Sequence, residues 1–193
     1  MKSFYIFFLF VGFSSFVLEK SFAEKLSEAA ISLTKDKVVY DPKYVSIPYP
    51  NVDVPKDRGV CTDVVIRAYR KLGIDLQKEV HLDMKKNFSL YPKTWGLKRP
   101  DTNIDHRRVP NLQVYFTRKG KSLGVSKKAS DYKTGDLVTW MIGGKLPHIG
   151  IATNRKSVDG KRNLIVHNVG SGQVLEDCLF RYEITGHYRF EKP

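Results

Sequence analysis

Apolar residues recur at helical spacing in two stretches of the first half of the chain. In residues 24–38 the apolar positions are Leu26, Ala29, Ala30 and Leu33. In the stretch that starts at Cys61 they are Val64, Val65, Ala68 and Leu72, and Gly73 follows as a natural helix stop. The spacing predicts one helix over residues 24–38, a second from Cys61 to Gly73, and a shorter one over residues 76–88.

The remaining pattern predicts extended structure. Residues 40–55 contain Pro48, Pro50 and Pro55, which exclude a helix there. Short apolar runs in the second half of the chain predict strands over residues 112–116, 136–141, 148–153, 164–169 and 186–190. Because helices come first and an antiparallel run of strands follows, the expected fold class is α+β.

The N-terminus has the pattern of a secretory signal peptide. Lys2 precedes an uncharged apolar run over residues 4–18, which is too short to span a bilayer, and the small residues Ser21 and Ala23 follow. We therefore expect a signal peptide over residues 1–23 and one domain over residues 24–193, located in the periplasm or secreted. The alternative is an uncleaved N-terminal anchor. We expect no membrane span after cleavage.

Charge and cysteine content narrow the function classes. Lys and Arg number 33 against 20 Asp and Glu, a net charge of +13 that favours an anionic partner. For an exported chain we expect peptidoglycan or another anionic envelope polymer, and no nucleic acid. The 2 cysteines exclude a disulfide-stapled mini-domain and a Cys-rich zinc module. We expect no metal, no cofactor and a monomer.

Cys61 is the candidate for thiol chemistry because it opens a predicted helix. A thiol in that position faces free backbone N–H groups and the positive end of the helix dipole, which lower its pKa. Arg58 also favours the thiolate, whereas Asp63 opposes it, so the sequence leaves the balance open. The alternative is that Cys61 is a small buried apolar residue.

Two histidines are expected to share one face of the sheet. A turn at Asp159 and Gly160 pairs residue 158 with residue 161, and strict alternation then places His148 and His167 on the same side. The opposite side becomes an apolar layer made of Ile149, Ile151, Leu164 and Val166. The alternative for each histidine is a structural role.

Other polar residues are weaker candidates. Residues 105–108 include His106, Arg107 and Arg108, and the arginines could hold a substrate carboxylate through paired hydrogen bonds. The alternative is a structural loop of salt bridges. Cys178 could pair with Cys61 in an exported protein, or it could be a small buried residue.

The motifs together resemble a known superfamily. They are Gly59-Val60-Cys61 at a helix start, the strand Gly135-Asp136-Leu137-Val138-Thr139-Trp140, His148-Ile149-Gly150-Ile151 and Val166-His167-Asn168. These resemble the NlpC/P60 superfamily of papain-like cysteine peptidases. The whole domain is also similar to the DUF1287 family of exported bacterial proteins, through stretches such as Tyr40-Asp41-Pro42, Arg58 to Val65 and Trp95-Gly96-Leu97.

The resemblance implies a papain-like fold in which the helix bearing the nucleophile packs on an antiparallel sheet. It implies Cys61 as nucleophile, His148 as general base, His167 as the orienting residue and Tyr49 near the oxyanion. Asp63, His106, Arg107 and Arg108 are then the candidate substrate-binding residues.

The implied function is an exported hydrolase that cleaves an amide bond in peptidoglycan through a Cys-His-His triad. Two departures from the superfamily pattern affect the cleft: Val60-Cys61-Thr62-Asp63 replaces its Asp-Cys-Ser-Gly signature, and residues 74–130 form a long insertion. The alternatives are an inactive wall-binding module of the same fold and a thiol acyltransferase.

Overall fold

The computed structural model describes residues 19–192, and most of the expected signal peptide lies outside that range. The helices are α1 (Phe22–Leu33), α2 (Cys61–Lys71), α3 (Leu76–Asn87) and α4 (Val109–Lys119), with short 3₁₀ turns at Phe88–Leu90, Asp105–Arg107 and Ala129–Asp131. The strands are β1 (Val39–Tyr40), β2 (Arg58–Gly59), β3 (Lys121–Ser122), β4 (Leu137–Ile142), β5 (Leu146–Lys156), β6 (Asn163–His167), β7 (Val174–Glu176) and β8 (Glu183–Arg189).

Helix α1 begins slightly earlier than the sequence pattern predicts. Ser21 caps it: its hydroxyl accepts a hydrogen bond from the N–H of Glu24, and the Glu24 carboxylate accepts one from the N–H of Ser21. Phe22 packs towards Tyr69 of α2, with 6.1 Å between ring centroids. The first turn of α1 is therefore fixed by a cap and by an aromatic contact.

One predicted strand is wrong, because residues 112–116 belong to helix α4. The alternation of apolar residues at Leu112, Val114 and Phe116 is typical of a strand. The buried positions, however, are Leu112, Tyr115 and Phe116. Those three recur at helical spacing, and Pro110 stands in the first turn, where its missing N–H costs nothing. The helical period prevails because this face packs into the main core.

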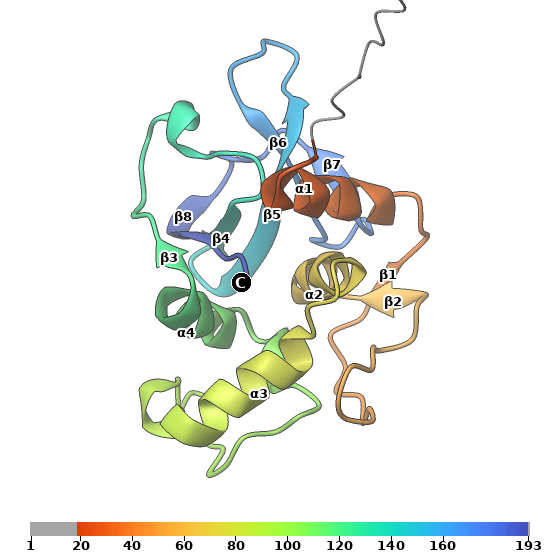
Figure 1. The fold of residues 1–193 in the computed structure, drawn as a ribbon, viewed down its shortest axis with the longest axis vertical. Helices are drawn as coiled ribbons and strands as arrows, with labels where there is room; N and C mark the ends of the chain where they lie inside the picture. The colour runs from red at the N-terminus through yellow and green to blue at the C-terminus, as the bar shows by residue number, and fades with distance from the viewer. Residues whose placement is uncertain (1–18, 193) are drawn as a thin grey trace, which may run out of the picture.

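The six-stranded sheet has the order β3-β8-β4-β5-β6-β7, and every neighbouring pair is antiparallel. Strands β1 and β2 form a separate parallel pair that joins Tyr40 to Gly59, two residues before Cys61. Figure 1 shows α1 in front of β5 and α2 beside it, with α3 and α4 in the lower part of the view, and both α1 and α2 contact β5. The expected α+β class, with the Cys61 helix packed on an antiparallel sheet, is confirmed.

The sheet has a different apolar cluster on each face. The helices pack against one face, through Leu137, Ile149, Ile151, Val166 and Tyr188. The other face carries a smaller cluster made of Tyr132, Val138, Trp140, Ala152, Ile165, Cys178 and Leu179. The two cysteines belong to different clusters, with Cys61 on the helical side and Cys178 on the other.

The predicted face of each histidine is confirmed, although the strand register changes at a bulge. Lys156 pairs with Asn163 beside the turn, and after a bulge Ala152 pairs with Ile165 and Ile151 with Val166. The bulge shifts the pairing by two residues, so it leaves each side chain on its expected face. His148 and His167 therefore lie on the same side of the sheet.

In the portion from residue 19 to residue 192, none of the helices combines the length and the apolar character that a membrane crossing requires.

Candidate active site

Cys61 is the first residue of α2, and a buried carboxylate organises the turn that contains it. The N–H of Val60 donates to Asp63 Oδ2 at 2.7 Å, which satisfies a backbone donor at the helix start. Gly59 leaves room for this contact, since a Cβ there would lie 3.0 Å from Asp63 Oδ2. The sequence Gly59-Val60-Cys61 therefore sets the thiol at the helix N-terminus.

Asp63 also holds Arg107, one of the candidate substrate-binding residues. Arg107 Nε donates to Asp63 Oδ1 at 2.9 Å and Nη2 donates to Oδ2 at 3.0 Å. Both side chains are buried, with 1% and 3% exposed. The pair, together with a hydrogen bond from Thr62 Oγ1 to the Arg107 carbonyl, joins the 105–107 turn to the start of α2. The structure thus uses both Asp63 oxygens internally.

The thiol stands at a pocket of about 300 Å³ between α2, the 105–110 region and the start of β5. Its lining includes Tyr40, Pro42, Cys61, Trp95, Arg107, Arg108 and Pro147. Arg108 lies over the Trp95 ring, with its guanidinium 4.1 Å from the ring centroid, and pairs with Asp105 at 3.4 Å. Arg108 is therefore the more accessible of the two candidate substrate-binding arginines, although its partner Asp105 is buried.

Burial determines the protonation state of Cys61. Desolvation raises the pKa of the thiol to about 12, and the charge of Asp63 adds to this, against the backbone N–H groups of Ile149 and Thr62, which lower it. At neutral pH the thiol is therefore protonated. The helix terminus does not by itself produce a thiolate here.

The two histidines form a buried hydrogen-bonded pair. His148 Nε2 and His167 Nδ1 lie 2.9 Å apart, and the ring planes meet at 80°. Desolvation lowers the pKa of His148 to about 3, with a smaller contribution from His167, and burial also lowers the pKa of His167. Both imidazoles are therefore neutral at pH 7, and one ring donates its only N–H to the other.

Two further groups surround the second nitrogen of His167. Nε2 lies 3.4 Å from Cys178 Sγ and 3.4 Å from Glu176 Oε2. Both cysteines are free, and burial raises the pKa of Cys178 to about 12. The structure thus favours the interpretation of Cys178 as a buried residue over a disulfide with Cys61. Sequence reasoning missed Glu176, because β7 is only three residues long and has no clear alternation.

Cys61 lies beside the backbone on both sides of His148. Pro147 lines the same pocket as the thiol, and the backbone N–H of Ile149 is among the groups that lower the pKa of the thiol. Within residues 19–192, His148 hydrogen-bonds to His167, and no hydrogen bond joins either imidazole to Cys61. The structure brings the two histidines together and places the thiol next to the strand that carries His148.

Tyr40, and not Tyr49, is the tyrosine at this pocket. Tyr49 is 39% exposed, and its ring lies 5.0 Å from that of His81 on α3. Tyr40 lines the pocket, where burial and the nearby Cys61 and Asp63 raise its pKa. Tyr40 is brought to the pocket by the pairing of β1 with β2. No sequence pattern indicates that pairing, so sequence reasoning missed this residue.

His106 is buried away from solvent, with 3% of its surface exposed. Desolvation lowers the pKa of His106 to about 4. It belongs to the 105–107 turn that Arg107 attaches to α2, and it does not line the pocket that contains Cys61. The position of His106 therefore indicates a structural role in the 105–107 turn.

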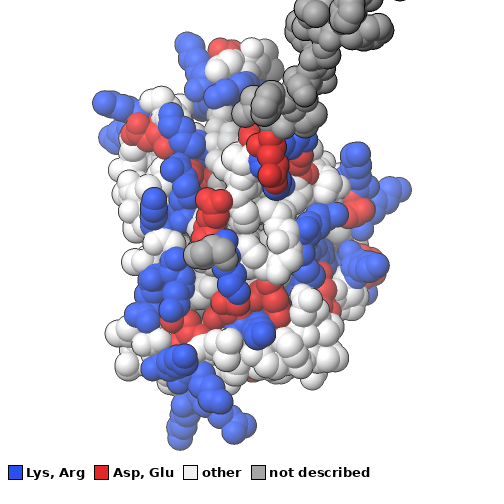
Figure 2. All heavy atoms as spheres, viewed as in Figure 1, with Lys and Arg blue, Asp and Glu red and all other residues white. Residues whose placement is uncertain are grey.

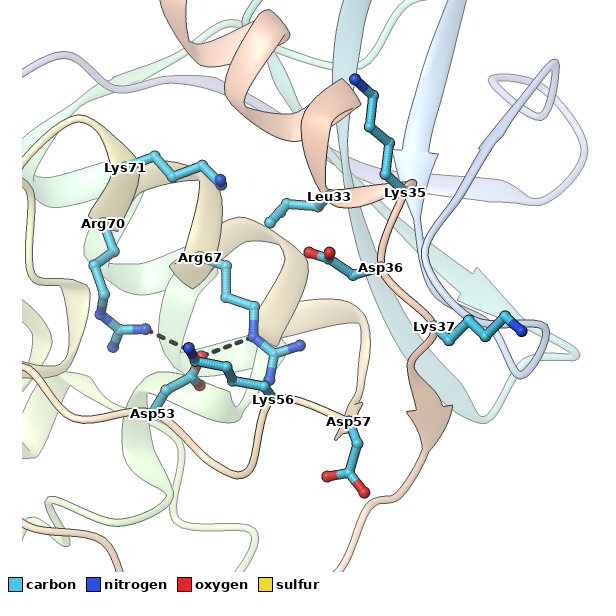
Figure 3. Close-up of a pocket in the computed structure, with 10 residues that line it drawn as sticks. All are labelled: Leu33, Lys35, Asp36, Lys37, Asp53, Lys56, Asp57, Arg67, Arg70 and Lys71. Atoms are coloured by element: carbon cyan, nitrogen blue, oxygen red, sulfur yellow. Dashed lines mark hydrogen bonds and ion pairs between the residues drawn. The ribbon is translucent and has the colours of Figure 1, made fainter.

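A larger cavity of about 720 Å³ lies elsewhere, against the end of α1 and the middle of α2. Figure 3 shows Asp53 held by Arg67 and Arg70, with four lysines around them. These are Lys35, Lys37, Lys56 and Lys71. In Figure 2, Lys and Arg side chains are spread over the visible face. This cavity has positive charge but lacks the thiol and the histidines.

The buried histidines predict a loss of stability in acid. Because His148 and His106 have lower pKa values folded than unfolded, the unfolded chain binds more protons below pH 6.5. The contribution of these neutral histidines to the free energy of unfolding is thus fully present above pH 6.5. It falls towards pH 4, by about 2 to 3 kcal/mol for each histidine. Asp105, whose pKa burial raises to about 6, offsets part of this. Urea unfolding of His148→Gln from pH 7 to 4 should show a shallower decline than the parent; an equal slope would contradict the buried neutral imidazole.

Comparison with known proteins places the chain in a family. A family model described as a domain of unknown function, DUF1287, matches residues 27–190. The chain is 54% identical to the uncharacterized protein YijF of Escherichia coli (strain K12) over 151 residues, which cover 78% of this chain and 73% of that protein. It is also similar to the solved structure of NlpC1 from Trichomonas vaginalis, at 14% identity and a TM-score of 0.48. The match covers 91% of this chain and 47% of that one, so this chain spans about half of that protein's length. Since the family match covers most of the chain, this protein belongs to the DUF1287 family.

Proposed function

We propose that this protein is an exported cysteine hydrolase that cleaves an amide bond in peptidoglycan, as an endopeptidase or an amidase. The observation that carries the proposal is the placement of Cys61 at a helix N-terminus, in a pocket, against the strand that holds the His148–His167 pair. Nucleophile, base and orienting group are the parts that thiol-based acyl transfer needs. The resemblance to NlpC/P60 enzymes supports the same assignment.

The tautomers required for catalysis depend on the partner of His167 Nε2, which lies 3.4 Å from both Cys178 Sγ and Glu176 Oε2. If Glu176 accepts the N–H of His167 Nε2, then His167 Nδ1 accepts the N–H of His148 Nε2. His148 Nδ1 is then unprotonated. The side chains of His148 and His167 lie on the sheet face that carries Trp140 and Cys178, whereas Cys61 belongs to the cluster on the helical face, so the proposal requires His148 Nδ1 to reach the thiol around the start of β5. Glu176 therefore supports the tautomer in which His148 is a base.

The reaction then proceeds by acyl transfer. His148 takes the thiol proton as the sulfur attacks the amide carbonyl, and the resulting imidazolium returns that proton to the leaving amine. The backbone N–H of Cys61 and the Tyr40 hydroxyl stabilise the oxyanion. Water, deprotonated by His148, then hydrolyses the thioester. Because thiol and imidazole are both neutral at rest, the proton moves during the attack.

Charge supports an acidic polymer as the substrate. Arg108 stands at the pocket, where its guanidinium can meet a carboxylate of a stem peptide. The lysines around the larger cavity, and the net charge of +13, would attract an anionic strand. We propose that the protein works as a monomer in the periplasm or outside the cell, after removal of its signal peptide.

Replacing Tyr40 with Phe should lower kcat/KM about 10- to 100-fold, because one oxyanion donor is lost while the ring still fills the pocket wall. Tyr49→Phe is the matched variant, and it should have no effect, since that ring lies beside His81. Steady-state assays of both variants on a soluble wall fragment would show whether Tyr40 or Tyr49 is the oxyanion donor. If only Tyr49→Phe slows the reaction, the oxyanion role belongs to Tyr49.

The proposal is tested by incubating the purified protein with peptidoglycan and separating the released fragments. We expect release by the parent protein and by Cys178→Ser, and none by Cys61→Ala. Binding of the wall by all three proteins without release would identify an inactive wall-binding module. Transfer of a labelled acyl group to an added amine, without net hydrolysis, would identify an acyltransferase.

A further inference from the structure

His167 belongs to a second group of chemically active side chains, on the sheet face away from α2 that also carries His148. His167, Glu176 and Cys178 each offer one ligand atom, and these three atoms lie within 4.8 Å of one another. His167 and Cys178 are buried, and Glu176 is half-buried at the edge. The ligands come from β6, β7 and the segment that follows β7, so the sheet itself brings them together.

The two distances from His167 Nε2 match those around a tetrahedral metal ion, and the Cys178 and Glu176 ligand atoms lie within 4.8 Å of each other. His167 Nε2 lies 3.4 Å from Cys178 Sγ and 3.4 Å from Glu176 Oε2. Two ligands of tetrahedral zinc are separated by about 3.3 to 3.6 Å, given Zn–N and Zn–O bonds near 2.0 Å and Zn–S bonds near 2.3 Å. The side chains would therefore need little rearrangement to bind an ion placed between them.

The surroundings also suit a metal. The second nitrogen of His167 is hydrogen-bonded to His148, and metal-bound histidines in proteins usually have such a partner. A thiolate and a carboxylate would neutralise a divalent ion, so the occupied site would carry no net charge. Arg181, which pairs with Glu176 at 2.6 Å, is 46% exposed and can turn towards solvent.

We propose that His167, Glu176 and Cys178 form a binding site for a thiophilic divalent cation of the zinc type. Thiolate and imidazole ligands favour zinc over magnesium or calcium, which prefer oxygen. Three protein ligands leave the fourth position to a water molecule.

Occupancy of this site would switch off the proposed hydrolase, a consequence that rests on the proposed function. A metal on His167 Nε2 leaves the ring proton on Nδ1, which then donates to His148 Nε2. The proton of a neutral His148 must then be on Nδ1, so this ring can no longer accept the Cys61 proton. The same hydrogen bond that supports the base would thus transmit the inhibition.

Cadmium binding to the Cys61→Ala protein tests the site directly. The chain has 2 cysteines, so in this background a near-ultraviolet thiolate-to-cadmium absorption band reports Cys178 alone. We expect one equivalent of Cd²⁺ to bind saturably and Zn²⁺ to displace it. Adding Cys178→Ser should remove the band, and adding Glu176→Gln should weaken binding about tenfold or more. Glu183→Gln, on the exposed surface of β8, is the matched control and should bind as the parent.

Three outcomes would overturn the site: no saturable band, a band that survives Cys178→Ser, or full affinity in Glu176→Gln. Thermal unfolding of each metal-free variant establishes that it is folded. In the wall-cleavage assay, Zn²⁺ should inhibit the parent and lose this effect in Cys178→Ser. Binding of cadmium by a protein that cleaves no wall under any condition would confirm the site and refute the hydrolase.

Discussion

Wall cleavage by His148→Gln should be slower than that of the parent protein on the order of 10³-fold. Glutamine has a similar size and can still hydrogen-bond to His167, but it cannot accept the Cys61 proton. With a thiol pKa of about 12, no resident thiolate can compensate for the missing base. The effect should fall on kcat, because the proton moves in the chemical step.

Variants of His167 separate orientation from proton transfer. His167→Asn retains an amide oxygen that can accept the N–H of His148 Nε2, so it should keep more activity than His167→Ala. His81→Gln, on α3 beside Tyr49, is the control and should cleave at the parent rate. Rates measured on one soluble wall fragment would rank the four proteins. If His148→Gln matched the control, His148 would not be the base.

Arg107→Met should destabilise the fold by about 3 to 5 kcal/mol, because it leaves Asp63 charged and buried without its partner. Asp63 also accepts from the Val60 N–H, so the start of α2 should loosen together with the 105–107 turn. Urea unfolding at pH 7 would measure the loss. Arg162→Met, which breaks an exposed pair with Asp177, is the matched control and should cost at most about 1 kcal/mol.

The double variant Asp63→Leu with Arg107→Met separates the pair's net contribution from the cost of an unpaired charge. Removing both charges should restore part of the stability lost in Arg107→Met, since an apolar pair can replace a buried ion pair at little cost. The recovery is incomplete because Asp63→Leu also leaves the Val60 N–H without its acceptor. Equal losses for Arg107→Met and for Arg162→Met would show that Asp63 is solvated in solution, contrary to its 1% exposure.

Much of the candidate site could be predicted from short-range regularities. The helix that starts at Cys61 follows from apolar spacing over eleven residues, and the shared face of His148 and His167 follows from strand alternation across one turn. Both rules act between neighbours along the chain or across one hairpin. For that reason a bulge of two residues did not disturb the second inference.

The wrong strand, and the site residues that sequence reasoning missed, depend on long-range contacts. Residues 112–116 have both periods, and only packing against the main core selects the helix. Tyr40 lies at the pocket of the thiol because β1 and β2, which are two residues long and separated by residues 41–57, pair in parallel. No local sequence pattern predicts that pairing. Glu176 meets His167 because β7 pairs with β6, again across a loop.

If the leader proposed for this chain is cleaved, the capped first turn of α1 makes the position of the cut matter. A cut after Ala23 would remove both Ser21, which caps the helix, and Phe22, which packs towards Tyr69. It would also place a new ammonium group at the positive end of the helix dipole, which is unfavourable. Loss of the cap alone is worth about 1 kcal/mol. A cut a few residues earlier would keep both the Ser21 cap and the Phe22 contact, so the choice of scissile bond would set how firmly the mature N-terminus is anchored.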